Sequence, residues 1–395
     1  MSNAFTDLCP KLPRRIPSLD GLRAISIAFV LCAHLVGTRH FPTQLHVLDH
    51  LGNYGVRCFF IISGFLITTL LLKELAATGT VSLRRFYLRR ILRIFPASFT
   101  YVGLMALAAS LGWIVLYPGD LWHALTYTMN YQNIPVAIPH ARANGWYLNH
   151  LWSLSVEEQF YMLWPAGVSL LLARRALKAA ATVILIAPLI RLLMCYLMAN
   201  VSDDILTTAL SRQFEAVADA LATGCLLAGA YNWLGAKPRY QAFLRSPYFL
   251  LVMIAGLLLP TLVFLKSALV FWVISQTILN ITIALCLERC VRYPEGIAGA
   301  ILNATPITAV GVLSYSLYLW QEPFLNQYNA SPLCAFPLNL GLVIMASVLS
   351  YFLVEKPFLR LKAGLERRWA ATGSLPAHPL RQTPMPLAAE QSGGN

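Results

Sequence analysis

An arginine and a histidine lie eleven residues apart in one apolar stretch, SLDGLRAISIAFVLCAHL. At about 100° per residue, Arg23 and His34 fall on nearly the same face of a helix, roughly 16 Å apart along its axis. An ionisable group at the centre of a bilayer costs at least ~2.5 kcal/mol, so each one requires an explanation. His34 is a candidate general base, and Arg23 a candidate anion ligand at the other end of the face. The alternative for His34 is a structural hydrogen bond to a neighbouring helix.

A second group of candidates lies in LRRFYLRRILRIFP. Arg90 and Arg93 are spaced i, i+3, and Arg89 lies four residues before Arg93, so these guanidinium groups are neighbours on a helix. The guanidinium fork matches the oxygens of phosphate and pyrophosphate groups. Arg90 and Arg93 are therefore candidates for phosphate binding. Anchoring of the helix end at anionic lipid is the alternative, and it is sufficient for the two arginines nearer the start of the segment.

The third group lies in LWSLSVEEQFYMLWP. Glu157 and Tyr161 share one helix face by the i, i+4 rule. A carboxylate there can orient an imidazole or a sugar hydroxyl, which makes Glu157 a catalytic candidate. One of Glu157 and Glu158 can face the bundle while the other faces the lipid headgroups. The alternative is an ion pair within the helix bundle, for which Arg57 and Arg191 are the potential partners.

Other polar residues carry weaker signals. Structural or gating roles are expected for Glu215 with Asp219, for Glu322 and for Glu355. The sequence has no serine nucleophile elbow, P-loop, HExxH or dinucleotide-binding glycine motif in a matching context. None of the 8 cysteines forms a C-x-x-C pair. They are expected to be small buried hydrophobes, not zinc ligands or disulfides, and no metal site is predicted.

The elements that position these residues are predicted to be membrane helices. Of the 395 residues, 57% are hydrophobic and 12% are charged, whereas a soluble domain carries roughly 25% charged residues. We predict an all-α, polytopic membrane helix bundle of about ten transmembrane helices. The apolar runs of spanning length lie near residues 20–38, 55–72, 94–112, 150–172, 179–199, 212–233, 247–265, 268–287, 306–325 and 337–355. The stretch 120–138 contains Asn and Pro, so a loop helix is expected there and not another span.

The distribution of Lys and Arg predicts the orientation. With a cytoplasmic N-terminus and alternating spans, roughly 23 of the 30 basic residues fall in inner segments and about four in outer ones. Both termini are therefore predicted to be cytoplasmic. The net charge of +13 is assigned to topology and anionic lipid, and no nucleic-acid partner is expected. The outer segment 113–149 is rich in Trp, Tyr, Asn and His, and it either caps a cavity, contacts sugar or forms an interfacial aromatic belt.

Three regions are predicted along the chain. Residues 1–17 form a cytoplasmic N-terminal segment, residues 18–360 the transmembrane domain, and residues 361–395 a disordered cytoplasmic tail. The first apolar segment is expected to be a retained helix and not a cleaved signal, because it contains Asp20, Arg23 and His34. No internal repeat and no second soluble domain are expected.

Five ordered motifs resemble those of the acyltransferase-3 family. They are SLDGLRA with a histidine eleven residues after its arginine, FFIISGFLIT, RRILRIFPA, LWSLSVEEQFYMLWP and SYSLYLWQEP. The resemblance extends across essentially the whole membrane portion. This is the multi-pass family of O-antigen, exopolysaccharide, nodulation-factor and macrolide acylases. It implies a membrane-bound O-acyltransferase of the bacterial inner membrane, surrounded by membrane lipid.

The resemblance also implies substrates and site residues. The donor is expected to be acyl-coenzyme A, commonly acetyl-coenzyme A, and the acceptor a hydroxyl of a carbohydrate or glycolipid, such as cell-envelope polysaccharide, lipopolysaccharide or a glycoside. Arg23 and His34 match the first-helix pair of the family, and Arg90 and Arg93 match its Arg-x-x-Arg motif. Glu157 matches the acidic position of its W-S-L-x-x-E motif.

The sequence departs from the family pattern at Gln321, where a histidine often follows Tyr-Leu-Trp, and this puts a catalytic role at that position in doubt. Some members carry a fused periplasmic hydrolase-like domain, and no segment of this sequence is long enough to form one. Acyl length, the acylated hydroxyl and homo-oligomerisation are left open.

A mechanism follows as a hypothesis. The phosphates of the donor bind Arg90, Arg93 and Arg23 from the cytoplasm, and His34 removes the proton of the acceptor hydroxyl, which typically contributes 10²–10⁴-fold. An acyl-histidine relay stays open as an alternative to direct transfer. The rival interpretation is a transporter or flippase of a sugar or lipid intermediate. Paired helices broken by Gly or Pro in two matching halves would support it, and the sequence shows none.

Overall fold

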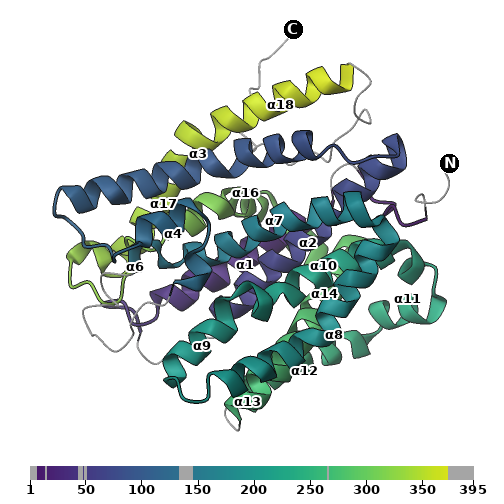
Figure 1. Cartoon of the computed structure of the whole chain (residues 1–395), viewed down its shortest axis with the longest axis horizontal. Coiled ribbons are helices and arrows are strands. Elements are labelled where there is room, and N and C mark those ends of the chain that lie inside the picture. Colours follow the sequence, from purple (N-terminus) through teal and green to yellow (C-terminus); the bar gives the residue numbers. More distant parts are fainter. Residues whose placement is uncertain are drawn as a thin grey trace.

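The structure is a computed structural model and describes residues 7–13, 16–42, 48, 51–132, 146–264 and 267–371. Within these ranges all regular elements are helical, and the long helices run roughly along the long axis of the molecule (Figure 1). The elements of the first half are α1 (Leu19–Leu35), α2 (Leu51–Thr78), α3 (Leu83–Ser110), α4 (Asp120–Leu125), the 3-10 turn η3 (Met129–Tyr131), α6 (Trp146–Asn149), α7 (Leu151–Leu171) and α8 (Ala173–Leu197).

The second half continues the same architecture with more interruptions. Its elements are α9 (Asp203–Arg212), α10 (Phe214–Gly235), α11 (Pro238–Arg245), α12 (Pro247–Phe264), α13 (Ala268–Val270), the π-helical turn η4 (Phe271–Ser275), α14 (Gln276–Arg292), α15 (Gly296–Leu302), α16 (Thr305–Trp320), the 3-10 turn η5 (Pro332–Cys334), α17 (Leu338–Ser350), the π-helical turn η6 (Tyr351–Glu355) and α18 (Lys356–Ala371).

Each apolar run expected to span the membrane coincides with a helix, so the all-helical class is confirmed. Among the described residues, six helical segments are long and apolar enough to span a membrane, and up to eight if each of two bent helix pairs is one span. Helix α1 has only 17 residues. Helix α7 carries two glutamates and a glutamine in succession, at 157–159, which lowers its apolar content. The count of ten spans and the orientation of the termini therefore stay predictions.

The centre of the bundle is formed by α1, α2, α10 and α16. Their buried side chains, including Ile27, Phe60 and Leu221, belong to one large hydrophobic cluster. Helices α1 and α16 approach closely because Gly311 has no side chain. A Cβ placed at Gly311 would overlap the backbone carbonyl of Asp20 in α1. Small residues permit such close contact between membrane helices.

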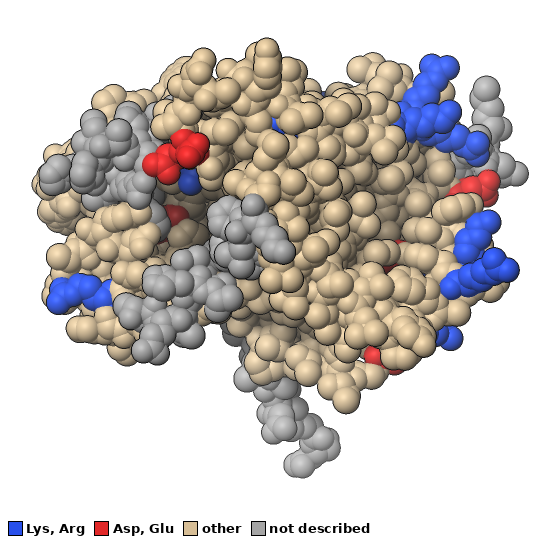
Figure 2. All heavy atoms as spheres, turned by 90° about the horizontal axis from the view of Figure 1, so that it is seen from below, with Lys and Arg blue, Asp and Glu red and all other residues tan. Residues whose placement is uncertain are grey.

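The outer surface is apolar over the middle of the molecule. Large aliphatic side chains are exposed along α8, α12 and α17, for example Leu185, Leu258 and Met345. The visible Lys and Arg side chains gather toward the two ends of the long axis, with a broad uncharged region between them (Figure 2). This is the pattern of a protein whose middle contacts lipid tails.

The segment between α3 and α7 contains the expected loop helix in two short pieces, α4 and η3. The carboxylate of Asp120 accepts hydrogen bonds from the backbone N–H of Tyr117 and from the side chain of Gln132. Burial raises the pKa of Asp120 to about 6, against the lowering effect of these hydrogen bonds. Gln159 of α7 donates to the Tyr127 carbonyl at 2.8 Å and so attaches the segment to α7. Residues 133–138 of the expected loop helix lie outside the described residues.

The region beyond residue 360 requires a correction. Disorder was expected from residue 361, but α18 continues to Ala371 and packs against α3. Its sequence alternates apolar and basic residues at helical spacing, and Lys362 and Glu366 form an i, i+4 pair at 3.9 Å. The boundary of the transmembrane domain predicted at residue 360 therefore falls inside a helix. The remainder of the tail lies outside the described residues.

Candidate active site

His34 lies in the last turn of α1, and its hydrogen bonding assigns its tautomer. Nδ1 of His34 is 2.9 Å from the carbonyl oxygen of Val30. A carbonyl can only accept, so Nδ1 must carry the hydrogen and donate it. The neutral imidazole then has its lone pair on Nε2. His34 is thus held by the backbone of its own helix in the tautomer that can accept a proton on the opposite side of the ring.

Glu322, which follows α16, is the acidic partner of His34. Its Oε1 lies 3.5 Å from Nε2 of His34, and its side chain is only 4% exposed. The sequence predicts a structural or gating role for Glu322 and makes Glu157 the carboxylate that orients an imidazole or a sugar hydroxyl. The structure instead brings Glu322 to His34, from a segment almost three hundred residues away. The sequence signal was the presence of an acidic residue in an apolar segment.

The surroundings of this pair contain many buried polar atoms without a hydrogen bond. Tyr101 contacts the ring of His150 at 5.4 Å and the ring of Trp320 at 5.3 Å. Within the described part of the chain, seven buried atoms at or beside this end of α16 have no hydrogen-bond partner: Nδ1 and Nε2 of His150, Nε1 of Trp320, Nε2 and Oε1 of Gln321, Oε2 of Glu322 and Nδ2 of Asn326. Native interiors rarely leave such groups unsatisfied, so a polar ligand or water is expected here.

His150 was not identified from the sequence. It directly precedes α7 and is only 3% exposed. Tyr318 of α16 donates a hydrogen bond to the His150 carbonyl at 2.7 Å, and the hydroxyl groups of Tyr318 and Ser153 are 2.6 Å apart. These contacts fix the beginning of α7 against α16. His150 is a single histidine at a predicted boundary between a loop and a helix, and nothing in the sequence around it indicates that it is buried against α16.

A cation lies on the same side of the bundle as His34. Arg212, the last residue of α9, donates to Oδ1 of Asn149 at 2.6 Å. Its guanidinium carbon is 5.7 Å from the ring centroid of Trp152. The contacts of Arg212 hold α9 against the start of α7.

Glu157 lies elsewhere in the bundle. It accepts hydrogen bonds from Ser63 at 2.9 Å and from Tyr161 at 3.0 Å. The second contact confirms that Glu157 and Tyr161 share a face of α7. The guanidinium of Arg90 lies over the ring of Tyr161, 3.9 Å from its centroid. Glu157 is therefore associated with the arginines of α3, and the contacts of the described residues do not join it to His34.

Glu158 and the two arginines offered as alternative partners of the α7 glutamates have other surroundings in the structure. Glu158 does not face the headgroups but is only 7% exposed. Arg57 and Arg191 do not pair with a glutamate of α7 but lie against Asp219 of α10, at 3.9 Å and 2.8 Å. The i, i+4 spacing predicts which residues share a face of α7. It does not predict which neighbouring helix that face contacts.

The cations at the opposite end of the site fall into two groups. Arg89 pairs with Glu74 at 3.4 Å, so its charge is compensated within the protein. Arg93 is half-buried, and Arg90 and Arg93 form no ion pair with any residue that the structure describes. Arg23 pairs with Asp20 at 3.4 Å. Among the arginines of this region, Arg90 and Arg93 are therefore the ones without an ion pair in the described residues, although Glu157 lies within electrostatic range of both.

The structure brings one further cation to these arginines. Arg93 lies within electrostatic range of Arg23 and Arg90. Lys362 of α18 is near Arg90 and Arg93 as well. The sequence analysis placed Lys362 in the tail, as one of many inner basic residues, so its position was not foreseen. Four basic side chains thus gather here, and carboxylates accompany two of them, Asp20 at Arg23 and Glu366 at Lys362. Such a cluster of cations can attract an anion such as phosphate.

Helix α16 connects the two ends of the site. The hydroxyl of Tyr315 donates to the carbonyl of Ile94, next to Arg93, at 2.9 Å. Glu322, at the level of His34, follows seven residues later, which corresponds to about 10 Å along a helix. Arg93 and the imidazole–carboxylate pair thus both lie along α16, Arg93 at the level of Tyr315 and Glu322 just beyond the end of the helix. In the described part of the chain, no group of three or more His, Cys, Asp or Glu residues is arranged to hold a metal ion.

Comparison with known proteins gives consistent matches. The profile of a family described as "Acyltransferase domain" matches residues 16–354. The chain is 27% identical over 356 residues to the O-acetyltransferase OatA of Staphylococcus aureus (strain NCTC 8325 / PS 47), which covers 87% of this chain and 57% of that protein. It is also 27% identical over 366 residues to YrhL of Bacillus subtilis (strain 168), which is named provisionally as a peptidoglycan O-acetyltransferase.

The second match covers 87% of this chain and 55% of YrhL. The chain thus spans little more than half the length of these curated relatives. No solved structure matches the chain.

Proposed function

The chain belongs to the family of acyltransferase domains, and from that premise we propose that it moves an acyl group, in the first instance acetyl, from acyl-coenzyme A to a hydroxyl of a carbohydrate. The observation that carries the proposal is the pair formed by His34 and Glu322, whose facing atoms are 3.5 Å apart. A base of this kind is what a hydroxyl needs to become a nucleophile at neutral pH.

In the proposed reaction the acceptor hydroxyl binds at Nε2 of His34. Nε2 takes the hydroxyl proton while the oxygen forms a bond to the carbonyl carbon of the donor. The carbon–sulfur bond breaks, and coenzyme A leaves as a thiolate that is protonated to the thiol. Glu322 stabilises the imidazolium formed during the step, as a carboxylate does beside a charged histidine. Direct transfer is the simpler path, and an acyl-histidine relay would use the same atom.

Support for a coenzyme A donor comes from Arg90 and Arg93, with Arg23 and Lys362 nearby. Guanidinium forks bind phosphate oxygens in bidentate geometry. Glu157 fits as a positioning residue, because it accepts from Tyr161, the ring over which Arg90 lies. The phosphates of the donor would then lie near Tyr315 of α16, and its thioester would extend toward His34.

Support for a carbohydrate acceptor comes from the seven unsatisfied atoms near Glu322. They include both donors and acceptors, which suits the hydroxyl groups of a sugar. The names of the relatives, an O-acetyltransferase and a provisional peptidoglycan O-acetyltransferase, point in the same direction. We further propose that the domain at 18–360 lies in the bacterial inner membrane, with acyl-coenzyme A on the cytoplasmic side and a cell-envelope glycan or glycolipid on the other.

The test is release of free thiol from acetyl-coenzyme A by the purified protein in lipid nanodiscs, with cell-envelope glycan as acceptor. His34→Gln should lose at least about 100-fold in turnover while still binding the donor, because an amide can form a hydrogen bond but cannot take the proton. His123→Gln, the same substitution in α4, is the matched control and should retain activity. Near-normal thiol release by His34→Gln would refute the assignment of the base. Substrate movement across vesicles with no thiol release by the wild type would favour a transporter.

A further inference from the structure

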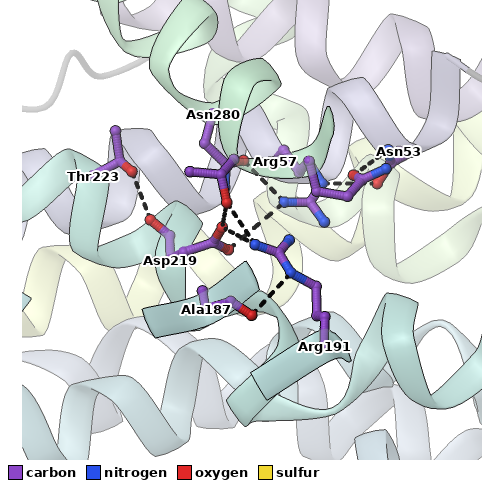
Figure 3. Close-up of polar contacts among 9 residues, drawn as sticks. Asn53, Arg57, Ala187, Arg191, Asp219, Thr223 and Asn280 are labelled. Atoms are coloured by element: carbon purple, nitrogen blue, oxygen red, sulfur yellow. Dashed lines mark hydrogen bonds and ion pairs between the residues drawn. The ribbon is translucent and has the colours of Figure 1, made fainter. Parts of the chain in front are cut away.

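A buried polar cluster lies where α2, α8, α10 and α14 meet, and the acyl-transfer reaction makes no use of it. Arg191 donates to Oδ2 of Asp219 at 2.8 Å, and Arg57 lies 3.9 Å from the other oxygen of the same carboxylate (Figure 3). Arg57 also donates to Asn53 at 3.0 Å and to Asn280 at 2.9 Å. Arg57 and Asp219 lie six and five residues after the first residues of α2 and α10, which is about one and a half turns, or roughly 8–9 Å, along each helix.

The charges of this cluster do not balance. Arg57 is 2% exposed, and Arg191 and Asp219 are 0% exposed. Two guanidinium groups share one carboxylate, and Asp219 is the only acidic partner of either arginine among the described residues. Arginine stays protonated in proteins. One positive charge is therefore left without compensation at membrane depth, where an unpaired charge is expensive.

The cluster also has more buried hydrogen-bond donors than acceptors to receive them. Nη1 of Arg191, Nδ2 of Asn280 and Nε2 of Gln276 are buried donors without a partner in the part of the chain that is described. Nη2 of Arg57 has no partner there either. The guanidinium groups of Arg57 and Arg191 face one another beside Asp219 (Figure 3). Two like charges facing each other in this way require something of opposite charge or strong polarity between them.

The unpaired groups indicate what that occupant is. A water molecule has two hydrogens to donate, but Oδ1 of Asp219 is the only acceptor without a hydrogen bond in the described cluster. The other unpaired groups are donors, and an anion accepts from donors without needing acceptors. Two guanidinium groups and one carboxylate leave a single positive charge, which one negative charge would balance. We propose that Arg57 and Arg191 hold a small monovalent anion of chloride size, which neutralises the cluster and joins α2 to α8.

The experiment measures thermal unfolding of the full chain in nanodiscs, in sodium chloride against sodium gluconate at equal ionic strength. A ligand that binds only the folded state raises the midpoint temperature in a saturable way. The wild type should unfold at a temperature higher by on the order of 3 °C in chloride. Arg57→Gln makes the cluster neutral and should lose this difference. Arg174→Gln, the same change at an exposed position of α8, should keep it.

A second variant keeps the proposal testable if Arg57→Gln does not fold. Asp219→Asn preserves shape but raises the net charge of the cluster by one, so half-maximal stabilisation should occur at a chloride concentration at least about tenfold lower. Bromide provides a direct readout, since its anomalous scattering in crystals of the wild type should give a peak between the two guanidinium groups. Equal melting in chloride and gluconate, equal chloride dependence in all variants, or no peak at saturating bromide would overturn the proposal and leave water as the occupant.

Discussion

The hydrogen bond from Nδ1 of His34 to Val30 determines what Glu322 does in the proposed reaction. Because Nδ1 already donates to the backbone, Glu322 does not orient the ring through that nitrogen. It lies on the side of Nε2, where the proton arrives. The carboxylate therefore stabilises charge that develops during the step, and it contributes little before the step.

This geometry predicts the effect of Glu322→Gln. Turnover should fall by about 10- to 100-fold, because the amide cannot neutralise the imidazolium. Binding of acetyl-coenzyme A should not change, because the proposed ligands of its phosphates are Arg90 and Arg93 and not Glu322. Thiol release and donor binding are measured on the same preparation. Glu215→Gln, whose carboxylate accepts only from Tyr131 in the described structure, is the control. An unchanged turnover number in Glu322→Gln would contradict the role.

The donor site is tested by the arginines of α3. Arg93→Ala should weaken binding of acetyl-coenzyme A by about tenfold, and the double change Arg90→Ala with Arg93→Ala by more, since each charge-assisted hydrogen bond contributes about 1.5–3 kcal/mol. Lysine should restore binding only in part, because it lacks the fork. Arg89→Ala is the matched control, since that charge is already paired with Glu74. Equal affinities of the double variant and the wild type for the coenzyme would exclude the phosphate assignment.

At the residue scale, the sequence identified candidate site residues but not all the side chains with which they pair. The shared face of Arg23 and His34 follows from helix geometry alone. The pairing of His34 with Glu322, and of Arg191 with Asp219, depends on how helices distant in sequence are arranged. Hydropathy of a single sequence contains no information on that arrangement. The side chain of Gln321 is notable because its buried polar atoms have no hydrogen-bond partner in the described structure. Such a lack of partners can be recognised only once the surroundings of the residue are known.

At the scale of elements, the contact between α1 and α16 fixes the distance between His34 and Glu322. Gly311→Ala should lower both the unfolding temperature and the turnover, because its Cβ would overlap the Asp20 carbonyl and push α1 away. Overpacking of this kind typically costs about 1–3 kcal/mol. Gly341→Ala in α17, where a Cβ meets open space, should be neutral or slightly stabilising. Thermal unfolding of both variants is the measurement, and identical behaviour would show that the close contact is not required.

The helices themselves were predictable because a run of apolar residues of spanning length is a strong local signal. The exceptions have physical causes. Helix α18 was missed because the basic residues around Lys362 suggested a solvated tail, whereas one face of the helix packs on α3. The 53° bend between α15 and α16 lies at a break of a few residues, which hydropathy averaged over a window does not detect.

At the scale of the whole molecule, the predicted orientation can be measured. In a variant whose native cysteines are replaced by alanine, Trp113→Cys should react with a membrane-impermeant maleimide in intact spheroplasts. Arg84→Cys should react only after permeabilisation. Both positions are exposed in the structure, so accessibility depends on the side of the membrane. A permeant maleimide should label both. The opposite pattern would invert the topology that the Lys and Arg distribution predicts.

The placement of the base and the anion site at opposite ends of α1 has an electrical consequence. The proton that His34 removes from the acceptor can follow either of two routes. If it passes to the departing thiolate, coenzyme A leaves as a thiol and no net charge crosses the bilayer. If His34 releases it to the acceptor side, the thiolate takes a proton from the donor side, and one elementary charge crosses per turnover. Each 100 mV of membrane potential would then change the free energy of acylation by about 2.3 kcal/mol, so a single imidazole decides whether the energised state of the membrane drives the reaction.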